Sequence, residues 1–132
     1  METIVRILLW VWQMPQNILG LIVGMFYVGD NGRYDLGYGH SAIVKRSGAM
    51  RGGISLGMYV IVPEGAGDNY VKHELGHCEQ SKMLGWFYLL AVGLPSIVWA
   101  CIHTYCAAAR RKSYYWFYTE RWADKLGGVS RD

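Results

Sequence analysis

The stretch ISLGMYVIVPEGAGDNYVKHELGHCEQSKMLG (54–85) decides the fold, because it joins a β-like run to a helix. Its first nine residues, 54–62, are rich in β-branched and aromatic side chains, which favour a strand. A proline and a glycine end that run, and Asp68 is a candidate N-cap for a helix that continues through HELGH towards Leu84. Gly85 offers a stop for this helix. The stretch therefore predicts a strand that leads into a helix.

The flanking sequence adds a second strand and a last helix. Glycines and polar residues separate the long run from a shorter β-like run, SAIVK (41–45), and the two runs predict a small antiparallel sheet. The segment YYWFYTERWADKLGG (114–128) suits a helix capped by Gly127 or Gly128. The predicted fold class is α+β: a small antiparallel β-sheet, a helix that bears HELGH, a C-terminal helix and an apolar N-terminal helical segment.

Length and composition indicate one apolar domain. With 132 residues the chain can bury one core but not build separate catalytic and substrate domains, so residues 1–132 are expected to form a single domain. Charged residues make up 17% of the sequence, below the usual share of about 25% in soluble domains. The net charge of +3 forms no stripe that could neutralise phosphates, which argues against nucleic acid binding. Three cysteines without CxxC spacing argue against a disulfide framework and a cysteine-rich zinc module.

Two long apolar segments suggest contact with a membrane. Residues 4–28 approach the thickness of a bilayer, but Pro15 should kink any helix there, so this segment could lie on, enter or span a membrane. Residues 84–109 are interrupted in their middle by Gly93 and Pro95, which predict a hairpin of two short helices. The basic triplet that follows this segment would then lie at the membrane interface.

The segment HELGH (73–77) has the HExxH pattern of zinc hydrolases. On a helix, His73 and His77 leave the same face about one turn apart and can chelate one metal ion. Glu74 lies beside the first histidine, where its carboxylate can take a proton from a metal-bound water and hand it to a leaving amine. The motif also falls where other signals predict a helix, which argues against a chance match. We therefore predict a site for Zn2+ with Glu74 as general base.

Catalytic zinc usually has three protein ligands and one open position, so a third ligand is needed. The extended pattern HExxHxxGxxH is absent, because residues 73–83 read HELGHCEQSKM. Glu120 and Asp124 stand four residues apart in the predicted last helix, which places both carboxylates on one face. Glu120 would bind the zinc, and Asp124 would accept a hydrogen bond from the free ring N–H of a ligand histidine. Spacing alone leaves open the alternative that this pair faces solvent, as acidic pairs on helices usually do.

HELGH (73–77) followed by ERWAD (120–124) resembles the HExxH and ExxAD motif pair of the gluzincin metallopeptidases, which include the CAAX prenyl proteases and the heat-shock membrane proteases. The resemblance covers about residues 53–128, since in that family a strand similar to GISLGMYVIV (53–62) leads into the motif helix and forms the edge that binds substrate. In size the chain is most similar to minimal gluzincin proteases. The resemblance implies these roles: His73, His77 and Glu120 as zinc ligands, Glu74 as base and Asp124 as a supporting residue.

The expected function is that of a zinc-dependent endopeptidase that acts on a peptide or protein substrate. An extended peptide would add to the edge strand around residues 54–62. The protein is expected to be membrane-associated, mainly through residues 4–28, with the catalytic part in the cytoplasm. Candidates by type for stabilising the oxyanion are His103, Tyr114, Tyr115 and Tyr118.

Two alternatives remain open at the level of sequence. In a non-catalytic, zinc-stabilised membrane or binding module, Cys78 or His103 would close the fourth position of the zinc. In a small apolar membrane protein, HELGH would be accidental and the purified chain would carry no stoichiometric metal. The sequence indicates neither the substrate nor the oligomeric state.

Overall fold

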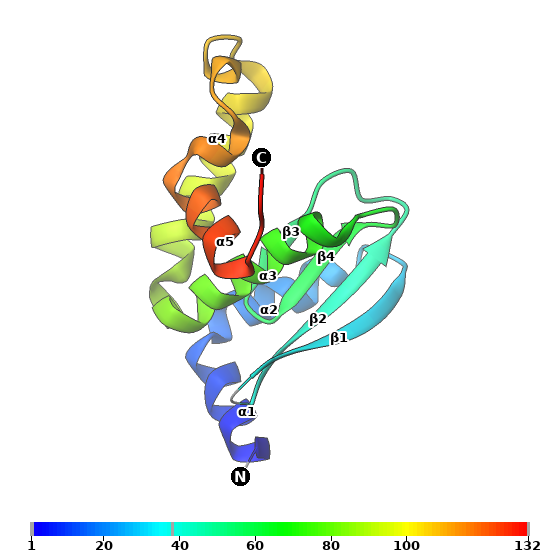
Figure 1. Cartoon of the computed structure of the whole chain (residues 1–132). Helices are drawn as coiled ribbons and strands as arrows, with labels where there is room; N and C mark the ends of the chain where they lie inside the picture. Colours follow the sequence, from blue (N-terminus) through cyan, green and yellow to red (C-terminus); the bar gives the residue numbers. More distant parts are fainter. Residues whose placement is uncertain (1, 38, 132) are drawn as a thin grey trace.

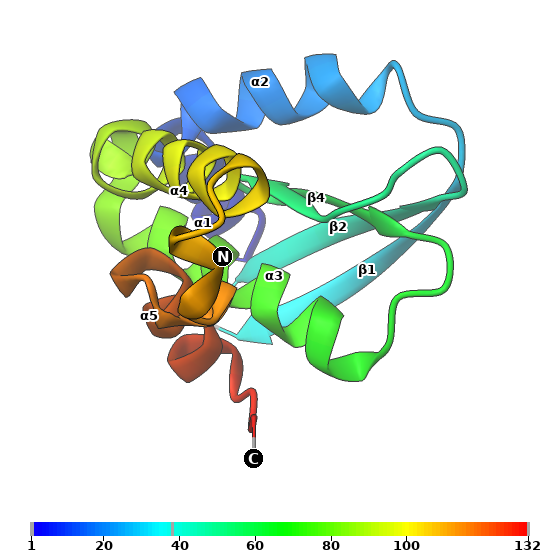
Figure 2. The same ribbon diagram turned by 90° about the horizontal axis from the view of Figure 1, so that it is seen from above.

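A four-stranded sheet forms the middle layer of the molecule. The computed structural model describes residues 2–37 and 39–131, and over these residues the fold is α+β, as predicted. The strands are β1 (Asp30–Gly37), β2 (His40–Ser47), β3 (Ile54–Leu56) and β4 (Tyr59–Pro63), in the order β1-β2-β4-β3. Figure 2 shows α2 (Met14–Gly24) on one side of the sheet and α3 (Asp68–Leu84) on the other.

The sheet is mixed, and the prediction of an antiparallel sheet was wrong. β2 pairs with β4 in parallel, whereas the pairs β1–β2 and β3–β4 are antiparallel. The run 54–62 holds two strands instead of one, because Gly57, with a φ of 67°, permits a two-residue turn between Leu56 and Tyr59. β3 therefore lies at the outer edge, and β4 returns between β3 and β2.

Alternation along the strands gives the sheet two different faces. α2 lies on the face of the sheet opposite α3. Its backbone approaches β4 closely, since a Cβ on Gly20 would come within 2.8 Å of the Tyr59 Cβ. The face towards α3 carries the main apolar core. This core cluster comprises Ala42, Val44, Val60, Val62 and Cys78.

Residues 84–109 do not form the predicted hairpin of two helices. After the 3₁₀ turn η1 (Gly85–Phe87), the chain continues as one helical rod made of the π-helical turn η2 (Leu89–Gly93) and α4 (Leu94–Tyr105). Pro95 lies in the first turn of α4, directly after the π-helical turn, where its ring and missing N–H are tolerated without a break. The rod projects from the body of the molecule (Figure 1).

The return path from the rod leads into the last helix. It runs through the 3₁₀ turns η3 (Ala109–Arg111) and η4 (Tyr114–Trp116), and the Trp99 indole N–H of the rod donates to the Tyr114 carbonyl at 2.8 Å. The last helix, α5 (Tyr118–Gly127), ends at Gly128, whose φ of 73° is the left-handed stop that the sequence predicted.

The N-terminal segment contains two helices at a right angle. α1 (Glu2–Trp12) and α2 are bent by 90°, and Pro15 occupies the first turn of α2, in agreement with the predicted kink. Within residues 2–37 and 39–131, no single helix is both long and apolar enough to cross a membrane. Only the bent pair α1 and α2 together meets that length and composition.

Candidate metal centre

Helices α3 and α5 cross at very close range because glycines line the crossing. A Cβ on Gly76 would lie 1.9 Å from the carbonyl oxygen of Ala123, and a Cβ on Gly127 would lie 1.9 Å from that of Lys72. No side chain fits at either position without moving a backbone. The glycine within HELGH therefore allows α5 to lie directly against α3, which brings residues 73–77 and 120–124 together.

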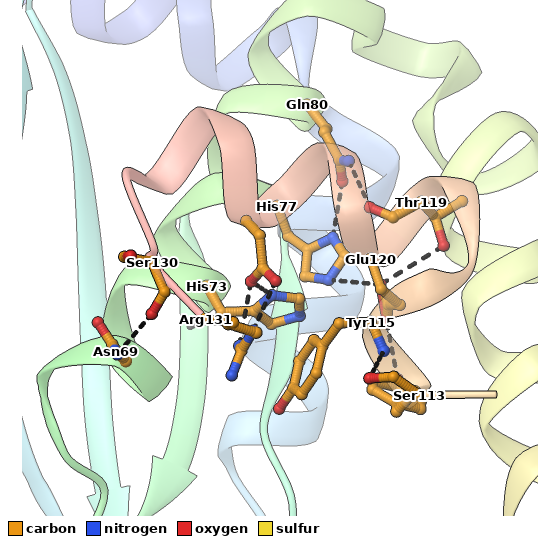
Figure 3. Close-up of polar contacts among 12 residues, drawn as sticks. Asn69, His73, His77, Gln80, Ser113, Tyr115, Thr119, Glu120, Ser130 and Arg131 are labelled. Carbon is orange, nitrogen blue, oxygen red and sulfur yellow. Dashed lines mark hydrogen bonds and ion pairs between the residues drawn. The ribbon is translucent and has the colours of Figure 1, made fainter. Parts of the chain in front are cut away.

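Three side chains from this crossing form one buried group. His73 and His77 of α3 and Glu120 of α5 each offer a ligand atom, and these atoms all lie within 4.8 Å of one another. The His77 Nε2 atom is 3.1 Å from the Glu120 Oε2 atom, as Figure 3 shows. Together these residues, which we call the His/His/Glu group, could hold a metal ion. The residues that the sequence suggested as ligands are thus brought together.

Both histidines of the group are oriented through their Nδ1 atoms. The His73 Nδ1 lies 2.6 Å from the Asp124 Oδ1, and the His77 Nδ1 lies 2.6 Å from the Gln80 Oε1. Because both partners are acceptors, each Nδ1 carries the hydrogen, and each Nε2 is left to face the centre. Asp124 thus lies next to one of the two histidines, as the sequence analysis expected.

Gln80 and Asp124, the partners of the two histidines, are themselves held by Thr119 and Arg131. The sequence analysis singled out none of Gln80, Thr119 and Arg131. The Gln80 side-chain amide donates to the Thr119 carbonyl at 2.8 Å, which fixes its oxygen towards the histidine. Arg131 donates to both oxygens of Asp124, from Nε at 2.6 Å and from Nη2 at 3.0 Å. The only sequence signal for Gln80 is its position three residues after His77, on the same helix face.

The protein charges around the group favour a cation at its centre. Burial alone would lower the pKa of His77, but the hydrogen bond and charge of Glu120, with Glu74 and Gln80, raise that pKa to about 9. Burial alone would raise the pKa of Glu120, but its hydrogen bond to His77 lowers it below the usual value. In the metal-free protein, His77 and Glu120 therefore hold a proton at the position where a metal ion would bind. Metal binding would release that proton.

Glu74 lies beside the group without belonging to it. Its side chain is buried, and burial raises its pKa to about 7, with His77 opposing the rise and Glu120 adding to it. The backbone at Gly53 approaches it closely, since a Cβ there would be 2.5 Å from the Glu74 Oε1. Glu74 is thereby held at the wall that separates α3 from the start of β3.

A cleft of about 540 Å³ opens between the edge strand β3 and the rod. Glu74, His77 and Glu120 all line it, together with residues 53–56 on one side and Ile97 on the other. β3 is the last strand of the sheet order, so its outer backbone edge has no strand partner among the described residues and borders this cleft. Two members of the His/His/Glu group, with Glu74, thus lie at the wall of a cleft whose volume is typical of ligand sites.

The remaining candidates from the sequence have different surroundings. Cys78 is fully buried in the core and its Sγ lies 3.4 Å from the Ser55 Oγ, whereas the His103 Nε2 lies 3.0 Å from the Lys112 carbonyl. Neither belongs to the His/His/Glu group, which has three members among the described residues. The structure therefore does not place the fourth protein ligand of the non-catalytic alternative.

The candidate tyrosines also separate. The Tyr114 hydroxyl lines the cleft and donates to the Glu120 Oε1 at 2.7 Å. The Tyr115 ring packs edge-on against the His73 ring, with centroids 5.1 Å apart, and lies under Arg131. Tyr118 donates instead to the Ala91 carbonyl of the rod. Of these three tyrosines, only Tyr114 both lines the cleft and contacts a member of the His/His/Glu group.

Comparisons of the chain with protein-family models, with curated proteins and with solved structures find no significant match.

Proposed function

We propose that this protein is a zinc-dependent endopeptidase whose site is the His/His/Glu group. The observation that supports this proposal most strongly is the placement of Glu74 beside two imidazoles and a carboxylate, with Glu74, His77 and Glu120 on the wall of one cleft. Two histidine nitrogens and one glutamate oxygen are a ligand set typical of catalytic zinc, which keeps its fourth position open. The resemblance of the HELGH and ERWAD motifs to those of gluzincins points to the same chemistry.

The proposed reaction uses the side chains of the chain in separate roles. Bound zinc would supply Lewis acidity that polarises the scissile carbonyl and lowers the pKa of water. Glu74 would take a proton from the attacking water and pass it to the leaving amine. Asp124 and Gln80 hold the imidazoles in orientation, and Tyr114 holds one oxygen of Glu120. An extended peptide would add as a strand to the outer edge of β3, within reach of Glu74.

The substitution Glu74→Gln tests the proposal. The wild-type protein should hold about one zinc ion per chain and cleave an unstructured protein such as casein, and the variant should keep the zinc but lose at least about a hundredfold in cleavage rate. Zinc is measured by elemental analysis and cleavage by the release of peptides. The amide keeps the shape of the side chain but cannot accept the proton.

The possible results distinguish the proposal from its alternatives. Loss of zinc in Glu74→Gln would mean that Glu74 is a ligand and not the base. A zinc-loaded wild-type protein that cleaves neither casein nor a panel of unstructured peptides would favour the non-catalytic module. A chain purified without stoichiometric metal, and unable to take up zinc, would contradict both zinc hypotheses.

A further inference from the structure

The outer surface of α1 is apolar over its whole length. Its exposed apolar side chains recur at the spacing of one helix face, so they form a continuous stripe on the surface. A surface helix of a water-soluble domain normally turns such a stripe inwards. The stripe consists of Ile4, Ile7, Leu8, Val11 and Trp12.

The rod carries a second stripe of the same kind. Its exposed apolar residues again recur three and four positions apart over four turns, and Cys101 lies exposed within the same series. α2 adds exposed apolar side chains, among them Ile18 and Ile22. The stripe on the rod consists of Leu90, Leu94, Ile97, Val98, Ile102 and Tyr105.

The last turn of α1 is hydrogen-bonded to the segment just before the rod. The Trp86 indole N–H, just before the rod, donates to the Val11 carbonyl of α1 at 2.9 Å, and the Trp12 indole N–H donates to the Lys82 carbonyl at 2.7 Å. In Figure 1 α1 and the rod project from opposite ends of the molecule. We call the exposed sides of α1, α2 and the rod the apolar surface.

In this part of the molecule, polar side chains lie inside and apolar side chains lie outside, the reverse of the usual arrangement in a protein surrounded by water. Beneath the apolar surface, Gln13, Gln16 and Asn17 are fully buried, and they form hydrogen bonds inside the protein. Gln16 donates to the Ser81 Oγ at 2.8 Å, Ser81 donates to the Gln13 Oε1 at 2.7 Å, and Asn17 accepts from the Met58 N–H at 2.7 Å. Polar side chains inside and apolar ones outside suit a surface that faces hydrocarbon instead of water.

The charges around this surface indicate the kind of partner. Residues 2–29 and 80–119, which build it, contain five lysines and arginines and only one, Glu2, of the ten acidic residues of the chain. Arg110, Arg111 and Lys112 are exposed at the tip of the rod. Two copies that met through this surface would bring cations against cations, whereas anionic lipid headgroups would neutralise them.

We propose that the apolar surface docks on a lipid bilayer with anionic headgroups, with the stripes of α1, α2 and the rod in the acyl region and the basic tip among the headgroups. Peripheral docking of this kind needs no spanning helix. It is independent of the proposed peptidase reaction, because the docking residues are not those of the His/His/Glu group.

Vesicle flotation of the full-length protein tests the electrostatic part. The protein should float with vesicles of equal parts phosphatidylcholine and phosphatidylglycerol, and Arg110→Gln/Arg111→Gln/Lys112→Gln should weaken this partition about a hundredfold. The matched control, Arg33→Gln/Lys72→Gln/Lys125→Gln, removes the same net charge from exposed positions on β1, α3 and α5 and should float like the wild type. Equal losses for the two triple variants, or a wild type that does not float, would overturn the proposal.

Fluorescent labelling tests the apolar part without altering the stripe. With Cys106→Ser, the exposed Cys101 on the rod can be labelled with an environment-sensitive dye, because Cys78 is fully buried. Vesicles should shift its emission to shorter wavelength, and nitroxide-bearing lipid should quench it. A label at Lys72→Cys, in a chain that also has Cys101→Ala and Cys106→Ser, should show neither effect.

Two results would contradict this second part. An unchanged Cys101 emission in protein that floats would mean that another surface holds the bilayer. A stable dimer in light scattering whose Cys101 label is shielded in the absence of lipid would assign the surface to a second copy of the chain.

Discussion

At the scale of single residues, the hydrogen bonds to the two Nδ1 atoms should matter nearly as much as the ligands. Asp124→Ala or Gln80→Ala removes the acceptor that orients one imidazole, and we expect about a 10–100-fold loss of zinc affinity for each. Glu120→Ala removes the proposed ligand on α5 and should cost more. Competition with a chromogenic chelator measures these affinities.

A matched control for these variants is Lys125→Ala, which truncates an exposed side chain on α5 outside the site. Its zinc affinity should equal that of the wild type. If Gln80→Ala also binds zinc with unchanged affinity, its contact with His77 does not orient the ring in solution. If Glu120→Ala does so, Glu120 is not a ligand.

Some of these site residues could be predicted from the sequence and others could not. His73, His77, Glu120 and Asp124 could be paired because each pair repeats at one helix turn, and the side chains on one helix face must lie together. Gln80 could not be singled out, because an amide one turn after a histidine is equally common on a solvent-facing helix. Its role depends on the Thr119 carbonyl of α5, a contact that exists only after the helices have packed.

At the scale of secondary structure, the crossing of α3 and α5 should depend on Gly76. In Gly76→Ala the added Cβ would lie 1.9 Å from a backbone oxygen, so the helices must separate, at a cost of about 1–3 kcal/mol in the free energy of unfolding. The better helix propensity of alanine, at most about 1 kcal/mol, should not offset this clash. Zinc affinity should fall too, because Glu120 moves away from the histidines.

Chemical denaturation and chelator competition measure both effects of Gly76→Ala. Gly65→Ala is the matched control, since a Cβ at Gly65 meets no atom within 4 Å and its backbone has no positive φ. It should alter neither stability nor zinc affinity by a measurable amount. A Gly76→Ala protein as stable as the wild type would mean that the helices cross at a larger distance than the structure shows.

The ends of helices could be predicted from the sequence because local residue signals mark them. The limits of strands could not, because pairing between strands distant in sequence determines them. The end of α3 at Gly85 and the stop of α5 at Gly128 follow from glycine at the helix ends. The division of residues 54–62 into β3 and β4 does not, because most residues there favour a strand and the pairing of β4 with β2 selects the turn at Gly57. β1 was missed because its glycine and aspartate residues disfavour strands, and pairing with β2 overrides that preference.

At the scale of the whole molecule, metal binding should link two distant parts of the chain. The histidines of the group precede the rod and Glu120 follows it, so the group forms only when α5 has returned to α3. A metal ion that binds this folded arrangement and not the unfolded chain stabilises the protein by about 2.7 kcal/mol when its free concentration is a hundred times Kd. For a domain of this size, such a gain corresponds to a Tm increase of roughly 10 °C.

Removal of the metal should therefore lower the Tm of the wild type by roughly 10 °C, and added zinc should restore it. Glu74→Gln should show the same shift, because its side chain is not a ligand. Glu120→Ala should lose most of the shift, whatever its own Tm, because the comparison is made within one variant with and without chelator. Differential scanning calorimetry in detergent provides these values. A chelator effect of equal size in Glu120→Ala would mean that Glu120 does not hold the metal, so that metal binding would not depend on the return of α5.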